Sequence, residues 1–195
     1  GAVIHEGTTP DLIELYNDNL EPLDLEGVRL TDDPLDPDKF IFPAGASIPA
    51  QGYLVVYANN RDGTTGYHLG FALNQQGESV YLYNAVEAGG ALLDTVSFGL
   101  QLTDISIGRQ VDGSWTLALP TFGAANRAAE LGDPARLHLN EWLASGVSLF
   151  DTDFIELYNP QALPVSLGGL YMSDEPMGWP DRHRLAPLSF LPGYG

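Results

Sequence analysis

The chain has 195 residues, which is enough for one or two domains, and its 44% share of hydrophobic residues can build a core. Its 26 acidic residues against 8 basic ones give a net charge of −18. That charge repels phosphate, so it argues against nucleic acids and anionic membranes as partners. The absence of cysteine excludes disulfides and thiolate chemistry, and no apolar run has membrane-spanning length.

Short β-rich runs, separated by 22 glycines and 14 prolines, follow one another along the chain. Turn residues at intervals of roughly 8–12 residues are typical of an all-β sandwich. We expect strands, in chain order, at residues 2–5, 12–17, 23–32, 39–42, 52–58, 78–84, 91–98, 104–110 and 114–118. No segment has the pattern of an amphipathic helix of normal length.

Three of these segments predict more than a strand. Residues 23–32 should form two short strands that bend at Gly27. The pair Asp112 and Gly113 should supply the positive φ angles of a tight hairpin turn. Residues 52–58, GYLVVYA, are almost continuously apolar, which predicts a central strand covered on both faces.

One stretch of sequence occurs twice. Residues 153–176 repeat residues 11–34 at a constant offset of 142, with 11 of 24 aligned positions identical. A period this long indicates a duplicated domain, since solenoid units have about 20–50 residues. Residues 189–195 match the stretch around residues 47–52, where the second copy stops. We therefore predict a complete sandwich at 1–127, a linker at 128–136 and a partial second module at 137–195.

Together these motifs resemble the bacterial lamin tail domain, an immunoglobulin-like β-sandwich. The residues that carry the likeness are the opening Ile4-x-Glu6, residues 13–17, 23–32 and 48–58, Ser106–Arg109, and residues 120–126. The likeness runs in order from Ile4 to Asn126 and restarts at Leu139. It implies a non-enzymatic interaction or spacer module of a larger extracellular or cell-surface bacterial protein. It names no ligand, because a shared fold does not fix a function.

An acidic loop is the sharpest chemical feature of the sequence. Four aspartates occur within seven residues: Asp32, Asp33, Asp36 and Asp38. Carboxylate oxygens are the ligands that Ca²⁺ prefers, and Pro34 and Pro37 stiffen the loop. The spacing fits no established calcium motif, so an ordinary turn between strands is the alternative. The interpretation that competes with a spacer is therefore a calcium-stabilised adhesion or carbohydrate-binding module.

Two glutamates occupy the same mid-strand position of the repeat, Glu14 and Glu156. A glutamate inside a strand needs a partner, and Arg109 is the candidate for Glu14, in a structural ion pair across strands. The second copy stops before it reaches its own equivalent arginine. Glu156 is therefore expected to lack a partner or to find one elsewhere.

Aromatic residues are frequent, and Tyr81 and Tyr83 should share one face of a strand. We expect this pair to form an aromatic surface suited to stacking against sugars. The alternative is that aromatic side chains simply cover the faces of an all-β domain.

No enzyme is predicted. The four histidines, His5, His68, His138 and His183, do not cluster in sequence, and there is no HExxH, GxSxG, GxGxxG or P-loop motif. An acidic hydrolase would need two carboxylates that converge in a cleft, which a sequence with 26 acids does not identify. No cofactor is expected, apart from the Ca²⁺ considered above.

Half a sandwich exposes apolar faces and open strand edges. We therefore expect residues 137–195 to pack against the first module or to exchange strands with another chain, which would make a homodimer.

Overall fold

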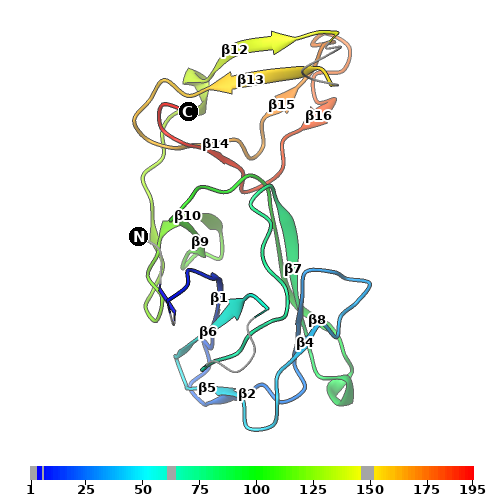
Figure 1. Ribbon diagram of the computed structural model, residues 1–195, viewed down its shortest axis with the longest axis vertical. Helices are drawn as coiled ribbons and strands as arrows, with labels where there is room; N and C mark the ends of the chain where they lie inside the picture. Colours follow the sequence, from blue (N-terminus) through cyan, green and yellow to red (C-terminus); the bar gives the residue numbers. More distant parts are fainter. Residues whose placement is uncertain (1–3, 6, 61–64, 146–151) are drawn as a thin grey trace.

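The computed structural model describes residues 4–5, 7–60, 65–145 and 152–195, and it consists of strands with two short 3-10 helices (Figure 1). The elements of the first half are β1 (Asp11–Tyr16), β2 (Leu23–Asp24), β3 (Arg29–Thr31), β4 (Phe40–Ile41), β5 (Ser47–Ile48), β6 (Tyr53–Ala58), β7 (Glu78–Tyr83), η1 (Val86–Ala88), β8 (Leu92–Phe98), β9 (Ser106–Arg109), β10 (Trp115–Leu119) and β11 (Arg127–Ala128). Those of the second half are η2 (Pro134–Arg136), β12 (His138–Leu143), β13 (Phe154–Tyr158), β14 (Val165–Ser166), β15 (Tyr171–Met172), β16 (His183–Arg184) and β17 (Phe190–Leu191). The all-β prediction is confirmed. Residues 2 and 3 of the expected opening strand, and Glu6 of the opening motif, lie outside the described residues.

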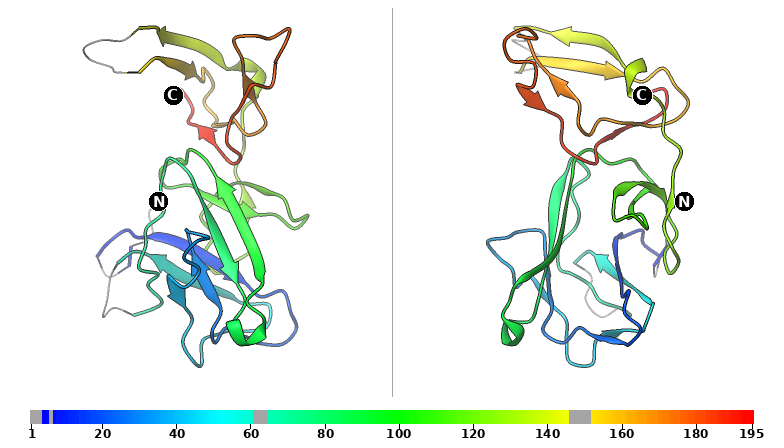
Figure 2. Two further views of the ribbon diagram at one scale, coloured as in Figure 1. Left: turned by 90° about the vertical axis from the view of Figure 1, so that its right-hand side faces the viewer. Right: turned by 180° about the vertical axis from the view of Figure 1, so that it is seen from behind.

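The first half is a sandwich of small antiparallel sheets. One layer is the four-stranded sheet β4-β3-β7-β8, and facing it are the pair β1-β6 and the sheet β11-β10-β9 (Figure 2). The core between the layers is aliphatic and aromatic, and its largest fully buried members are Leu30, Phe42, Ile48, Val56 and Leu69. Ile13 and Leu15 of β1 and Val80 and Leu82 of β7 pack at alternate positions into or against this core, in agreement with the sequence alternation of these two strands.

The apolar strand β6 is placed differently from its prediction. It pairs with β1 along its whole length, from Asp11 opposite Ala58 to Tyr16 opposite Tyr53. On its other side the described residues add only the isolated bridge between Tyr57 and His68. The prediction of a central strand covered on both faces is therefore wrong: Val56 and Ala58 are buried, whereas the other four side chains of β6 are half-buried.

The second half repeats the hairpins of the first. The pair β2-β5 places Leu23 opposite Ile48, and β14-β17 places Val165 opposite Leu191. In the same way, β3-β4 places Arg29 opposite Ile41, and β15-β16 places Tyr171 opposite Arg184. All of these partners correspond under the sequence offset of 142, or 143 after one inserted residue near Met177.

Unusual backbone angles repeat as well. Gly27 and Gly169 both have positive φ angles, 75° and 86°, at the bend between two short strands. Before the loop to β6, Gln51 has a φ of 54°, and Tyr194 matches it at 57°. Such angles are uncommon for residues other than glycine, so their recurrence indicates the same loop built twice.

A buried asparagine ties each of these loops together. The Asn17 side chain donates to the carbonyls of Glu21, Ile48 and Pro49, at 2.9, 3.2 and 3.0 Å. In the second half, Asn159 donates to the carbonyls of Leu163 and Pro192, at 2.9 and 2.8 Å. Both side chains are almost fully buried, so these carbonyls depend on them for hydrogen bonding.

The two halves stack along the long axis of the molecule and meet through backbone hydrogen bonds (Figure 1). Gly99 N donates to Pro187 O, and Phe190 N donates to Leu100 O, both at 2.9 Å. Gly99 is needed for this approach, because a Cβ atom there would lie 1.9 Å from Ser189 Oγ. β11 still pairs with β10, so the first sheet system extends to Ala128, one residue into the predicted linker.

Candidate interaction surface

The predicted ion pair between Glu14 and Arg109 is wrong. The Arg109 Nη2 atom lies 2.7 Å from both carboxylate oxygens of Asp94, and its guanidinium stacks over Trp115 at 4.7 Å. Asp94 belongs to β8, the edge strand of the four-stranded sheet, and Arg109 belongs to β9 of the facing layer. The arginine therefore joins the two layers at their edge, where the half-exposed pair contributes little net stability.

Glu14 is satisfied by backbone instead. Gly123 N donates to Glu14 Oε2 at 2.6 Å, which holds the segment after β10 against β1. Burial raises the pKa of the Glu14 carboxyl above its ordinary value, and this hydrogen bond offsets part of the rise. Glu156, its repeat counterpart, also has a partner, because the side-chain amide of Asn140 donates to its Oε1 atom.

The acidic loop is built as a structural turn. Lys39 Nζ lies 2.7 Å from Asp32, whose carboxylate raises the pKa of that amine, and Arg29 Nη1 lies 2.9 Å from Asp38. The Asp33 carboxylate accepts from Leu35 N at 2.9 Å, and Asp36 is exposed. Among the described residues, no three potential ligand side chains converge as a metal site would require. The four aspartates thus do not form the predicted cluster.

The second copy of this loop uses the same contacts. The Thr31 hydroxyl donates to Asp36 O at 2.8 Å, and the Ser173 hydroxyl donates to Trp179 O at 2.6 Å. The ion pair of Asp32 with Lys39 recurs between Asp174 and Arg182. Two further acidic residues lie in this second loop: the Glu175 amide donates to the Ser173 hydroxyl, and Asp181 is exposed. The acidic residues are therefore explained in large part by the turn that they brace.

Tyr81 and Tyr83 do share one face of β7, as predicted from the alternation. Their rings are stacked, with centroids 6.3 Å apart and an angle of 21° between the planes. Both side chains are half-buried, and the Arg29 guanidinium lies 5.5 Å from the Tyr83 ring. They lie on the face of the sheet opposite to the core residue Val80.

The structure brings together two histidines that are far apart in sequence. His5 and His68 both contact the Tyr57 ring, with centroid distances of 3.9 and 5.1 Å, and their own centroids are 5.8 Å apart. His68 Nδ1 also lies 2.7 Å from the Asn59 side-chain oxygen. No spacing in the sequence indicates this stack, because it depends on the pairing of residues near the start of the chain with the end of β6.

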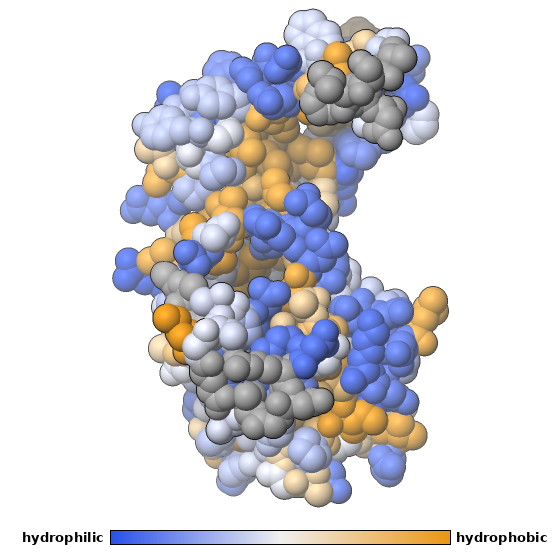
Figure 3. Space-filling model, in the orientation of Figure 1, coloured by the Kyte–Doolittle hydropathy of each residue, from blue (hydrophilic) through white to orange (hydrophobic). Residues whose placement is uncertain are grey.

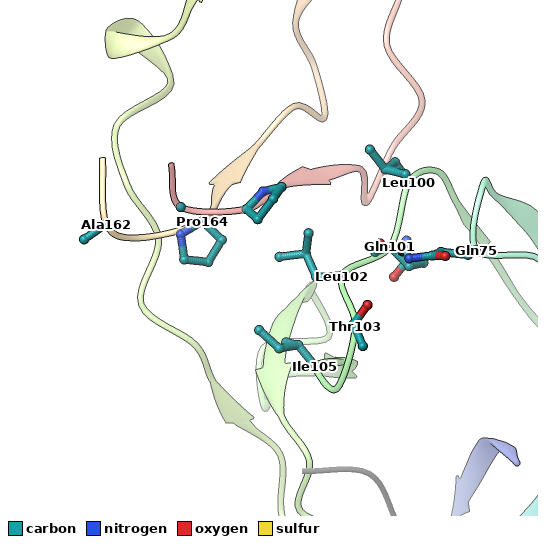
Figure 4. A pocket seen from close by; sticks show the side chains of 10 residues that line it. Gln75, Leu100, Gln101, Leu102, Thr103, Ile105, Ala162 and Pro164 are labelled. Carbon is teal, nitrogen blue, oxygen red and sulfur yellow. Dashed lines mark hydrogen bonds between the residues drawn. The ribbon is translucent and has the colours of Figure 1, made fainter. Parts of the chain in front are cut away.

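A pocket of about 540 Å³ lies at the junction of the two halves (Figure 4). The first half contributes Leu100, Leu102 and Ile105, and the second contributes Pro164 and Pro192 among others. Its polar groups are the amides of Gln75 and Gln101 and the hydroxyl of Thr103. The Gln101 amide is engaged in the junction, since it donates to Leu188 O at 2.8 Å. The pocket therefore belongs to the contact between the halves.

The C-terminal half exposes large apolar side chains. These are Leu139, Trp142, Ile155, Leu163, Tyr171, Met177, Trp179 and Tyr194. Figure 3 shows hydrophobic surface gathered in a hollow of this half, in the upper part of the view. In the first half, the counterpart of Ile155 is Ile13, which packs against the core. The same sequence position is thus covered in one half and 57% exposed in the other.

The first half makes a strand pairing that is absent from the described residues of the second. There, β1 is covered by β6 along six residue pairs. In the described part of the second half, β13 pairs with β12 alone. Its last neighbour on the other side is Gly195, whose carbonyl accepts from Asn159 N at 2.7 Å. The C-terminus lies on the side of β13 away from β12 in Figure 1 and in both views of Figure 2.

A family model of the lamin tail domain matches residues 2–99, half of the chain. The chain belongs to the lamin tail domain family. This family is an immunoglobulin-like β-sandwich that serves in general as a non-catalytic structural module, in agreement with the predicted fold. No curated protein and no solved structure matches the chain. Among the described residues of this lamin tail protein, no helix is long and apolar enough to cross a membrane.

Proposed function

We propose that this chain is a non-enzymatic interaction module of a larger bacterial protein that acts outside the cell or at its surface. The observation that carries the proposal is the apolar surface of the β12-β13 hairpin, where Ile155 and Trp142 are 57% and 71% exposed. Exposed apolar patches on ordered domains usually mark surfaces for other molecules. Membership of a family of structural modules supports a role without catalytic activity.

Residues 137–195 act in this proposal as a partial second lamin tail module. Its support is the recurrence of hairpin register, of two positive φ angles and of the buried asparagine, described above. Two modules fixed end to end also give the chain its extended shape, which suits a spacer between a surface and a further domain (Figure 1).

Cell fractionation with an antibody against residues 1–127 tests the proposed setting. We expect a band well above 21.0 kDa, the mass of these 195 residues, in the surface or culture-medium fraction. A band of 21.0 kDa confined to the cytosol would contradict the proposal. Serum proteins added to the blot serve as a control against non-specific antibody binding.

The stacked pair of Tyr81 and Tyr83 favours the second candidate, an adhesion or carbohydrate-binding module stabilised by Ca²⁺. A glycan array tests the sugar arm, with Tyr81→Ala as the variant that should lose any signal. Thermal melts in EDTA and in millimolar calcium test the ion. Saturation well above the dissociation constant should stabilise by about 2–4 kcal/mol, and the gain should vanish in Asp36→Ala. If calcium does not change the melting temperature and no glycan on the array binds, the second candidate is wrong and only the interaction module remains.

Homodimer formation through residues 137–195 stays a prediction, and sedimentation equilibrium of the chain tests it. Gly99 and Phe190 already hold this half against the first module of the same chain.

A further inference from the structure

We propose that the outward face of the sheet β4-β3-β7-β8 binds a basic, extended segment of a partner protein, with an arginine or lysine side chain of that segment over the Tyr81 ring. This site deepens the interaction function proposed above and rests on it. Tyr81 and Tyr83 are also the basis of the sugar-binding candidate, so their neighbours decide which ligand the face favours. All of these neighbours lie within residues 29–97 of the first half.

The outward face carries the two tyrosines among small hydroxyl side chains. Because Val80 of β7 packs in the core, Tyr81 and Tyr83 point to the other side of the sheet. In the register of the sheet, Tyr81 lies opposite Thr31 of β3 and Thr95 of β8. The left view of Figure 2 looks onto this sheet, with the second half of the chain above it. The second half therefore leaves this face to a partner.

Arg29 shows what this face does with a cation. Its guanidinium lies 5.5 Å from the centre of the Tyr83 ring, and its Nη1 atom lies 2.9 Å from the Asp38 carboxylate. The face of an aromatic ring attracts a cation electrostatically, and the carboxylate balances the charge. The Tyr81 ring is stacked with Tyr83, but among the described residues no cation lies over it. Tyr81 thus offers a second ring of the same kind to a cation from another molecule.

The acidic loop supplies a carboxylate for that cation. The Thr31 hydroxyl, opposite Tyr81 in the sheet, donates to Asp36 O at 2.8 Å and holds the loop beside this ring. The two cations of this region already pair with Asp32 and Asp38, whereas the exposed Asp36 has no ion-pair partner in the described part of the chain. A basic ligand would balance this charge and a neutral sugar would not. The net charge of −18 adds attraction at longer range.

The apolar neighbours of the tyrosines favour a peptide over a small cation. Leu92 lies opposite Tyr83, and Ile41 lies beyond Arg29 in the same row of the sheet. These two side chains are 48% and 50% exposed. The tyrosine rings are 6.3 Å apart, close to the span of two residues in an extended chain, about 6.4–6.8 Å. An extended segment along β7 can therefore place a basic side chain over Tyr81 and an apolar one beside Leu92.

Heteronuclear NMR titration of the intact chain tests the site, because it reports affinity and location together. The parent peptide alternates arginine and leucine at every second position, with serine between them. In the control peptide, citrulline replaces each arginine, which keeps the shape and removes the charge. We expect saturable shifts of backbone amides in residues 29–36 and 79–97, and about tenfold weaker binding of the control peptide. Equal binding of both peptides, or shifts confined to the second half, would overturn the proposal.

Single substitutions separate the ring from the carboxylate. Tyr81→Leu keeps an apolar side chain without a ring and should weaken binding of the parent peptide about two- to fivefold. Asp36→Asn changes an exposed side chain, so the fold is retained, and should weaken binding about twofold. Asp181→Asn removes the same charge from the matching loop of the second half and should leave binding unchanged. An equal loss in Asp36→Asn and Asp181→Asn would show that binding follows net charge alone, and the site would be wrong.

The glycan array described above decides between the two uses of the tyrosines. A glycan signal that disappears in Tyr81→Ala, without binding of the parent peptide, would overturn the basic segment as ligand and support the sugar-binding candidate. Failure of the interaction function as a whole is a different result, namely a chain of 21.0 kDa confined to the cytosol.

Discussion

Residues 11–52 and 153–195 form the same turns and hairpins, but they bury different positions. In the first half, Leu23 and Ser47 of the β2-β5 hairpin are exposed, although Ile48 of the same hairpin is buried in the core. In the second half, the matching residues are Val165 and Phe190, and both are almost fully buried. The side of β13 shows the opposite, since Ile155 is exposed where Ile13 packs against the core.

The comparison shows that local structure and burial have separate causes. The turns recur because the same glycine, proline and asparagine residues specify them. Burial depends on what lies alongside, and the second half has the first module against β17 and no β6 counterpart against β13 in the described chain. The first half has Ser47 where the second half has Phe190, and this difference in sequence accompanies the new contact.

The largest effect is expected for Phe190→Ser, which gives the second half the residue of the first. Phe190 is 1% exposed, so its loss leaves a cavity and should cost about 3–5 kcal/mol. Native-state hydrogen exchange should show the loss of protection in residues 153–195, with residues 11–52 retained. Trp142→Ser is the matched control, because Trp142 is 71% exposed and should change stability by less than about 1 kcal/mol. Equal loss of protection in both halves would show that they unfold as one unit.

Asn17→Ala should be nearly as damaging. It removes the donor that serves three backbone carbonyls, and at least one of them, that of Ile48, is buried. Unpaired buried carbonyls should lower the free energy of unfolding by about 2–4 kcal/mol in a urea titration. Asn159→Ala should act in the same way, but only on the second half. Asn74→Ala is the control, since its exposed side chain accepts only from Gln76 N. A small loss in Asn17→Ala would mean that water replaces the amide.

Arg29→Met breaks a contact that only the first half has. Arg29 is 7% exposed and donates to the carbonyls of Asn84 and Gly90, at 3.2 and 3.3 Å. Methionine keeps an apolar stem but no donor, so a loss of about 2–3 kcal/mol is expected. Tyr171 holds the same repeat position, is 49% exposed, and Tyr171→Met should change the free energy of unfolding by less than about 0.5 kcal/mol. Equal losses of unfolding free energy in the two variants would show that the difference in burial between the two positions does not matter for stability.

Most of the fold could be predicted from the sequence. Alternation located β1 and β7, and a β-rich run located β8. Gly27 and Gly113 have the positive φ angles predicted for them, whereas the same prediction for Asp112 is wrong. The repeat predicted that residues 153–195 would follow the path of the first half, and their hairpins have the same register. These features are local, so neighbouring residues suffice to specify them.

The contacts between distant segments could not be predicted in this way. The sequence contains 26 acidic residues that could pair with Arg109, and nothing in it indicates which one does. Asp94 is the partner because it lies on the facing edge of the other layer. The pattern of aspartates in the acidic loop predicts metal ligands, because the sequence does not show that Lys39 and Arg29 pair with two of these carboxylates. The buried role of Asn17 had a signal that was available, namely its identity with Asn159 at a position where a loop begins. A residue that is identical in both copies of a repeat should therefore be considered first for a structural role, and only then for a catalytic or binding role.

The smallest effect is expected for Glu14→Gln, and it concerns pH. Burial raises the pKa of Glu14 in the folded chain, so folding disfavours its charged form. The parent chain should therefore lose stability as pH rises from the ordinary glutamate pKa through the raised one. Glutamine still accepts from Gly123 N and carries no charge. Relative to the parent, the variant should become more stable as pH rises above the ordinary glutamate pKa, by less than about 1 kcal/mol because solvent screens the half-buried carboxyl. Urea titrations of both chains measure this difference, in which Glu78, whose pKa burial also raises, cancels. If the variant instead becomes less stable than the parent as pH rises, the hydrogen bond from Gly123 to the charged carboxylate outweighs the effect of burial.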